Sequence, residues 1–212
     1  MTDFNDDLLE LPSDEESSAH AIGSWIVSYC DLMTVLVVFF LMMLSPQAVL
    51  SDAQDEKKSN LKEALEEIKE IAKEEKFDKF IEIEQKGNRG KIVLTDQLLF
   101  ESGNAKIKTT QKEILKKIVG SLKPLNGSHM FSIMGHTDSV KINSAEFQSN
   151  WYLSTARALT ILDTFIDLEF NQKNISAQGF GEFQPIVEEY DKKGGLIEEN
   201  KAKNRRVEIN IQ

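Results

Sequence analysis

Residues 25–44 read WIVSYCDLMTVLVVFFLMML, and this stretch decides the architecture of the chain. It contains one charged residue, Asp31, and with the apolar residues before it the run is long enough to cross the roughly 30 Å hydrocarbon layer of a bilayer as a helix. Trp25 and Tyr29 lie near its first end, where interfacial aromatic residues are common. The alternative is a buried helix of a soluble protein, but nothing later in the chain offers enough partners to surround it. The sequence therefore predicts a transmembrane helix over residues 21–45.

Charged segments flank this helix on both sides. Residues 1–20 hold seven acidic residues and no Lys or Arg, and such a segment cannot bury enough apolar surface to fold, so we expect a flexible tail. Residues 46–80 are rich in Lys and Glu and predict a helical linker. Four apolar residues of this linker follow a coiled-coil spacing over about two heptads: Leu61, Leu65, Ile68 and Ala72. A dimer seam and a solvated single helix both fit this short pattern.

Residues 81–212 alternate between strand-like and helix-like patterns, which predicts an α+β or α/β sandwich. The expected strands are residues 91–94, 98–100, 130–135, 175–179 and 206–211, and the expected helices are residues 109–123 and 150–168. The second helix has an apolar stripe suited to packing on a sheet, made of Ala158, Leu159, Leu162, Phe165 and Ile166.

The composition argues against several functions. The net charge of −10, from 35 acidic and 25 basic residues, repels phosphate, so we expect no nucleic-acid partner. One cysteine, Cys30, and three histidines far apart in sequence do not suggest a metal site, and no cofactor is expected. His136 and Asp138 have no second carboxylate or nucleophile at a suitable spacing, so we do not expect an enzyme.

Asp31 is the residue of the apolar stretch that most requires a functional explanation. A carboxylate near the centre of a membrane helix costs about 2.5–3.5 kcal/mol on insertion scales, and intramembrane acids commonly mark ion pathways or partner contacts. By helical spacing Ser28, Met33 and Thr34 fall on the same broad side, and the two hydroxyl groups are suited to lining a wet path. A protonated Asp31 with a passive role is the alternative. One helix cannot enclose a channel, so partner helices are expected.

Two sets of motifs carry a family resemblance. In the membrane segment, SW at 24–25, YCDLMT at 29–34 and FFL at 39–41 resemble MotB-type stator proteins, the MotB/ZorB family. The soluble part resembles the OmpA-like peptidoglycan-binding domain, which implies a mixed sheet with helices on one face over residues 81–212. The motifs of this second resemblance are GHTD at 135–138, SNWYLSTARA at 149–158, GFGE at 179–182, Pro185, and NRRVEI at 204–209.

The resemblance implies a binding site for the diaminopimelate of the wall peptide. Asp138 would take the ammonium group of this residue, and Arg157 would bind its carboxylate with the planar guanidinium fork. Three further residues would line the same pocket: Thr137, Asn150 and Leu153. Without the resemblance, Asp138 reads as a turn-capping residue and Arg157 as part of a surface salt bridge. The resemblance makes one of Arg205 and Arg206 a sheet-edge or pocket residue. The alternative is that the two form a solvated basic pair.

The same resemblance implies a peptidoglycan-anchored, ion-conducting B subunit of a MotA/MotB-type rotary motor. Asp31 would carry the ion, and Tyr29 favours protons over sodium ions. Two copies would pair inside a ring of MotA-like membrane subunits, and residues 46–60 could plug the path. The motor would be a flagellar stator or the ZorB-like motor of Zorya anti-phage defence. A structural tether between inner membrane and wall, without ion flow, is the alternative.

The implied topology is single-pass in the bacterial inner membrane, with a cytoplasmic N-terminus and a periplasmic C-terminal domain. Two features depart from it. The tail is acidic, whereas flagellar members of the family have a basic one, and Lys57, Lys58 and Lys62 follow the helix, which the positive-inside rule assigns to the cytoplasm. The wall-binding motifs outweigh this rule, because a wall-binding domain has no ligand in the cytoplasm.

Overall fold

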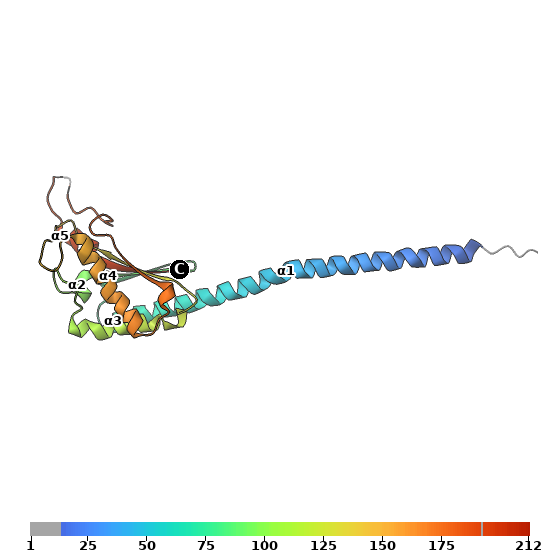
Figure 1. Ribbon diagram of the computed structural model, residues 1–212, viewed down its shortest axis with the longest axis horizontal. Helices are drawn as coiled ribbons and strands as arrows, with labels where there is room; N and C mark the ends of the chain where they lie inside the picture. Colours follow the sequence, from blue (N-terminus) through green and yellow to red (C-terminus); the bar gives the residue numbers. More distant parts are fainter. Residues whose placement is uncertain (1–13, 192) are drawn as a thin grey trace, which may run out of the picture. The chain divides into compact units, whose positions relative to one another are not determined.

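The computed structural model describes residues 14–191 and 193–212, with side chains for 25–43, 57–191 and 193–212. The chain divides into two units, Met1–Asp52 and Ala53–Gln212. A flexible tail was expected over residues 1–20. Its residues 1–13 lie outside the described residues, and helix α1, Asp14–Glu74, begins at the next residue. Figure 1 shows the ribbon of the chain coloured along the sequence.

The first unit contains the apolar part of α1. Residues Trp25–Met43 have a mean hydropathy of 2.2 and are exposed along their whole length, so this segment is long and apolar enough to cross a membrane. Exposure of so many large apolar side chains is unfavourable in water and favourable among lipid chains. The expected apolar N-terminal helix is therefore present.

The second unit is built on a five-stranded mixed sheet with the strand order β1-β2-β5-β3-β4. The strands are β1 Ile81–Lys86, β2 Arg89–Thr95, β3 Phe131–His136, β4 Ile175–Gly179 and β5 Arg206–Ile211. All neighbouring strands are antiparallel except β3 and β4, which are parallel and are joined by helix α4, Asn150–Asp167. A parallel pair requires such a crossover connection, which explains why the long helix lies between these two strands in the sequence.

One face of the sheet is apolar and packs against helices. Side chains alternate along the strands, so Phe131 and Ile133 of β3 and Val207 of β5 share this face and are fully or almost fully buried. Helices α3, Thr109–Ser121, and α4 run beside the sheet (Figure 1). The expected mixed sheet with helices on one face is confirmed.

The apolar stripe of the linker is buried inside the second unit. Leu61 and Ile68 are fully buried and Leu65 and Ala72 nearly so, and all four belong to the same core as the sheet. Leu61 approaches Gly90 of β2 so closely that an added Cβ there would lie 3.1 Å from its Cδ1 atom. The stripe is thus neither a dimer seam nor a solvated helix face, because the sheet of its own domain covers it.

Several local predictions were wrong or incomplete. Where a strand was expected at 98–100, Leu98 and Leu99 instead end a short helix, α2, Asp96–Leu99, and Phe100 forms an isolated β-bridge with Ile107. Strand β1, helix α5 (Glu198–Asn204) and the 3₁₀ turns Lys123–Leu125 and Gln172–Asn174 were not predicted. In α4 the buried stripe includes Ile161, whereas Leu159 and Ile166, expected in it, are 46% and 38% exposed.

Candidate functional site

The five residues that the sequence assigned to a wall-peptide pocket line one cavity of about 640 Å³. Thr137 and Asp138 come directly after β3, and Asn150, Leu153 and Arg157 lie on α4. The spacing of the last three brings them to one side of the helix. The structure therefore brings together side chains from two segments that the sequence separates.

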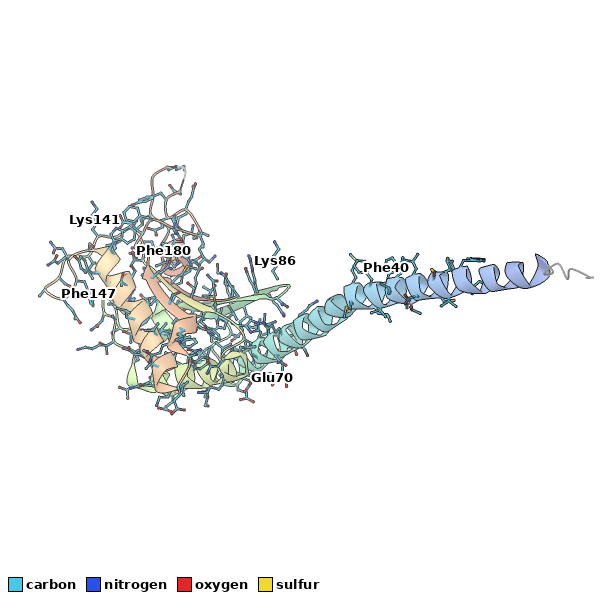
Figure 2. All side chains as sticks on the ribbon, turned by 45° about the vertical axis from the view of Figure 1, so that its right-hand side comes forward. Phe40, Glu70, Lys86, Lys141, Phe147 and Phe180 are labelled. Carbon is cyan, nitrogen blue, oxygen red and sulfur yellow. The ribbon has the colours of Figure 1, made fainter. Side chains whose placement is uncertain are left out.

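Asn150 holds the loop that follows β3. Its Nδ2 atom donates to the carbonyl oxygens of Asp138 at 3.3 Å and Val140 at 3.0 Å, and to Glu182 Oε2 at 2.6 Å. Leu153 stabilises the same region, because it packs with Ala105 and Phe147 in a small second core. Figure 2 shows Phe147 in the loop region near the beginning of α4. The loop that carries Asp138 is thus fixed by both polar and apolar contacts.

A chain of alternating charges runs along the cavity wall. Arg157 Nη2 lies 2.9 Å from Asp96 Oδ1, Arg205 Nε lies 3.7 Å from Asp96 Oδ2, and Arg205 Nη1 donates to Asp138 Oδ2 at 2.7 Å. The first contact is an ion pair without hydrogen-bond geometry, because Asp96 Oδ1 accepts no hydrogen bond among the described residues. The charges of the two residues predicted to bind the wall peptide, Asp138 and Arg157, are therefore each compensated by an oppositely charged residue of the protein.

Arg157 is the most deeply placed member of this chain. Only 2% of its surface is exposed, its Nε donates to Asn104 O at 3.0 Å, and its guanidinium lies over the Phe100 ring at 5.2 Å. Burial lowers the pKa of Arg157, and Asp96 opposes that shift. Burial likewise raises the pKa of Asp96, against the attraction of Arg157 and Arg205. The surface salt bridge considered for Arg157 is excluded, because this pair is buried.

Asp96 and Arg205 are site residues that sequence reasoning missed or left open. Nothing in the sequence near Asp96 pointed to the cavity, although Arg205 lies in a motif that was singled out. Arg206 is buried, with its Nε donating to Glu208 Oε1 at 2.6 Å. The alternative of a solvated basic pair is therefore wrong. Arg205 lines the cavity, and Arg206 lies on the face of the sheet opposite to that of Val207.

His136 is next to the cavity residues in sequence but does not line the cavity. It is 2% exposed, stacks on Phe180 with ring centroids 5.3 Å apart, and neither ring nitrogen has a hydrogen-bond partner among the described residues. Burial lowers the pKa of His136 to about 4, with a further contribution from Arg206. Among the described residues no cluster of three or more His, Cys, Asp or Glu could hold a metal ion.

The residues predicted for ion transfer lie on the exposed apolar part of α1. Asp31, Ser28 and Thr34 are all exposed there, and the Thr34 hydroxyl donates to the Asp31 carbonyl oxygen at 2.8 Å. That hydrogen bond satisfies the hydroxyl inside its own helix, as Thr commonly does in membrane helices. The carboxylate of Asp31 remains on an outward surface that only partner helices, lipid or water can cover.

Two families match parts of the chain. Residues 12–66 match the family described as the membrane MotB of the proton-channel complex MotA/MotB, and residues 99–195 match the OmpA family. Motility protein B of Bacillus subtilis is 26% identical over an alignment of 245 positions, which covers 91% of this chain and 91% of that protein.

Solved structures share the fold of the second unit. A MotB-like protein from Desulfovibrio vulgaris superposes with a TM-score of 0.62 at 20% identity, over 76% of this chain and 98% of that one. The periplasmic domain of Helicobacter pylori MotB superposes with a TM-score of 0.55 at 24% identity, over 62% of this chain and 81% of that one. At these identities the likeness establishes the fold.

Proposed function

Because the chain is a MotB-type protein with an OmpA-like domain, we propose that it is the peptidoglycan-anchored B subunit of a MotA/MotB-type rotary motor. In this proposal the second unit grips the cell wall and Asp31 carries the ion. The wall grip holds this subunit still, so that a surrounding ring of MotA-like subunits does the moving.

One observation carries the wall-binding part of the proposal: Asp138 and Arg157 line the same cavity with opposite charges. The free end of diaminopimelate carries an ammonium and a carboxylate, which match a carboxylate and a guanidinium in this arrangement. Thr137, Asn150 and Leu153 are among the other residues that line this cavity. These opposite charges support peptidoglycan as the ligand of the cavity.

Wall binding is tested with the full-length protein in detergent, sedimented with isolated walls that contain diaminopimelate. Asp138→Asn should weaken binding about tenfold or more, because hydrogen bonds to charged groups contribute about 1.5–3 kcal/mol. Asp163→Asn is the matched control, since Asp163 is exposed on α4 and does not line the cavity. Equal sedimentation of the two variants would refute the pocket.

The ion-carrying part rests on the cost of an acid in an apolar helix. Moving one elementary charge through 100 mV releases about 2.3 kcal/mol, several times thermal energy, so a carboxyl group that binds and releases a proton can drive a conformational step. Two copies of α1 inside a MotA-like ring would supply the cover that Asp31 lacks on its own helix. We assign protons as the transported ion because Tyr29 precedes this acid by two residues, as in proton-driven relatives.

The proposed topology is an inner-membrane single pass with the N-terminus in the cytoplasm and the second unit in the periplasm. The wall-binding cavity supports it, because its ligand is found on that side only. The motor is either a flagellar stator or a ZorB-like motor of anti-phage defence. A non-conducting tether would keep the cavity but would have no use for Asp31.

A further inference from the structure

The cavity is basic although the protein as a whole is acidic. The chain has a net charge of −10, yet five basic and only two acidic side chains line the cavity. The acidic ones are Asp96 and Asp138, and the basic ones are Lys108, Lys141, Arg157, Lys201 and Arg205. A concave site with excess positive charge concentrates field and attracts anions. A single zwitterionic group, with no net charge, leaves that excess unexplained.

The two arginines and two aspartates compensate one another, so the excess charge comes from lysines. Lys108 Nζ donates to the Gln97 carbonyl oxygen at 2.7 Å and so has part of its hydrogen-bonding capacity used. Lys141 is exposed, and its ammonium group forms no ion pair or hydrogen bond with any residue that the structure describes. Lys141 is therefore able to bind an incoming anion at little cost to the protein.

Lys201 is a buried residue whose ion-pair partner is exposed to solvent. The residue is 8% exposed, and its ion-pair partner is Glu198, whose side chain is 72% exposed, at 3.1 Å. The other nearby acid, Glu189, is held by hydrogen bonds from Ser139 and Asn204. Burying a charge beside a solvated partner is unfavourable, and a second anion would reduce that cost.

Lys141 and Lys201 line the cavity from different segments of the chain. Lys141 lies three residues after Asp138, in the loop whose Val140 carbonyl Asn150 holds. Lys201 lies one helical turn before Arg205, which pairs with Asp138. Both lysines therefore belong to the lining of the cavity that also holds Asp138 and Arg157.

We propose that Lys141 and Lys201 form a second carboxylate subsite, which selects wall peptides whose neighbouring carboxylates are free over peptides in which one is amidated. The inference rests on the proposed function and adds the specificity of the same cavity. Amidation replaces a negative group by a neutral one of nearly equal size, so it removes the attraction to the lysines without blocking the cavity.

The test compares two soluble peptides in binding calorimetry with the full-length protein in detergent. Both are L-alanyl-γ-D-glutamyl-diaminopimelate, one with the α-carboxylate of its glutamate free and one with that group amidated. The unaltered protein should bind the free peptide about tenfold more tightly, the effect of one charged hydrogen bond. Lys141→Gln and Lys201→Gln should each reduce that preference and leave affinity for the amidated peptide within about twofold.

Lys86→Gln is the matched control. Lys86 ends β1 at the hairpin and lies far from Lys141 in Figure 2, so the same change of charge there should keep the preference. Lys141→Gln alters an exposed side chain, and therefore tests the idea even where Lys201→Gln disturbs α5.

Each outcome decides between the two proposals. Equal affinity of the unaltered protein for both peptides, with binding still lost in Asp138→Asn, would overturn the second subsite and leave wall binding intact. A preference that survives both lysine substitutions would overturn the assignment of these residues. Failure of the unaltered protein to bind either peptide would remove wall-peptide binding itself, and the subsite with it.

Discussion

His136 shows at the scale of one residue how strongly burial controls a titratable side chain. The ring stacks on Phe180, and it faces Arg206 and Glu208 of β5 and Lys91 of β2. Glu208 Oε1 lies 4.0 Å from His136 Nε2, too far for a hydrogen bond. The buried ring therefore packs as part of the protein interior, where its neutral form is favoured.

Protonation of His136 should make the second unit less stable in acid. Its pKa of about 4 in the folded protein lies below the value near 6.5 in the unfolded chain. Its contribution is therefore complete above pH 6.5 and is lost as pH falls towards 4. This difference in pKa corresponds to at most about 3–4 kcal/mol.

Replacement of His136 by Phe should flatten this dependence. The ring nitrogens make no hydrogen bonds with described residues, so the change should cost little at pH 7.5. Urea unfolding of both proteins between pH 7.5 and 4.5 measures it. His129, whose pKa burial also lowers, is present in both, so the difference between the two curves isolates His136. Parallel curves would contradict the assignment.

Residues of the site differed in how well sequence predicted them. Thr137, Asp138, Asn150, Leu153 and Arg157 lie within motifs, and all five line the cavity. The partners of the two charged residues could not be found in this way. Asp96 reaches Arg157 through the pairing of β2 with β5 and the packing of α4, and such a contact depends on the tertiary fold alone.

At the scale of elements, the approach of α4 to the sheet depends on Gly135. A Cβ atom at this position of β3 would lie 2.1 Å from the Ser154 carbonyl oxygen, which is rigid helix backbone. Gly135→Ala should therefore push α4 from β3, destabilise the unit by about 1–3 kcal/mol and weaken wall binding, because α4 carries Asn150 and Arg157.

Gly120→Ala provides the control for that substitution. A Cβ at Gly120, within α3, would meet nothing within 4 Å, so alanine should be neutral or stabilise the protein by up to about 1 kcal/mol. Thermal unfolding followed by circular dichroism compares the two. Equal melting temperatures would mean that α4 is not seated as closely as described.

The sequence predicted secondary structure incorrectly where the local residue pattern and the tertiary context disagree. In β1, Ile81 and Ile83 alternate with Glu82 and Glu84, which is a strand pattern, but the segment follows a charge-rich helix and no strand was predicted in it. The apolar residues 98–100 read as a strand, yet Leu98 and Leu99 are buried by a single helical turn. Short apolar runs fit either state until their partners are known.

At the scale of the whole molecule, the proposal requires that wall binding and ion transfer be separable. Asp31→Asn removes the ionisable group but keeps its size, so the variant should insert and sediment with walls like the unaltered protein. The host strain should stop swimming if the motor is flagellar. It should swim normally and lose phage resistance if the motor serves defence. No change in either property would favour the non-conducting tether.

The buried stripe of α1 has a mechanical consequence. A tensile load that travels along the chain towards the wall enters the second unit through a helix whose Leu61, Leu65 and Ile68 are seated in the core. To detach this helix along its axis, all three side chains must move together under shear, which resists force better than peeling contacts one at a time. If the second unit holds the wall as proposed, the load would therefore be carried by the packing of these three side chains in the core.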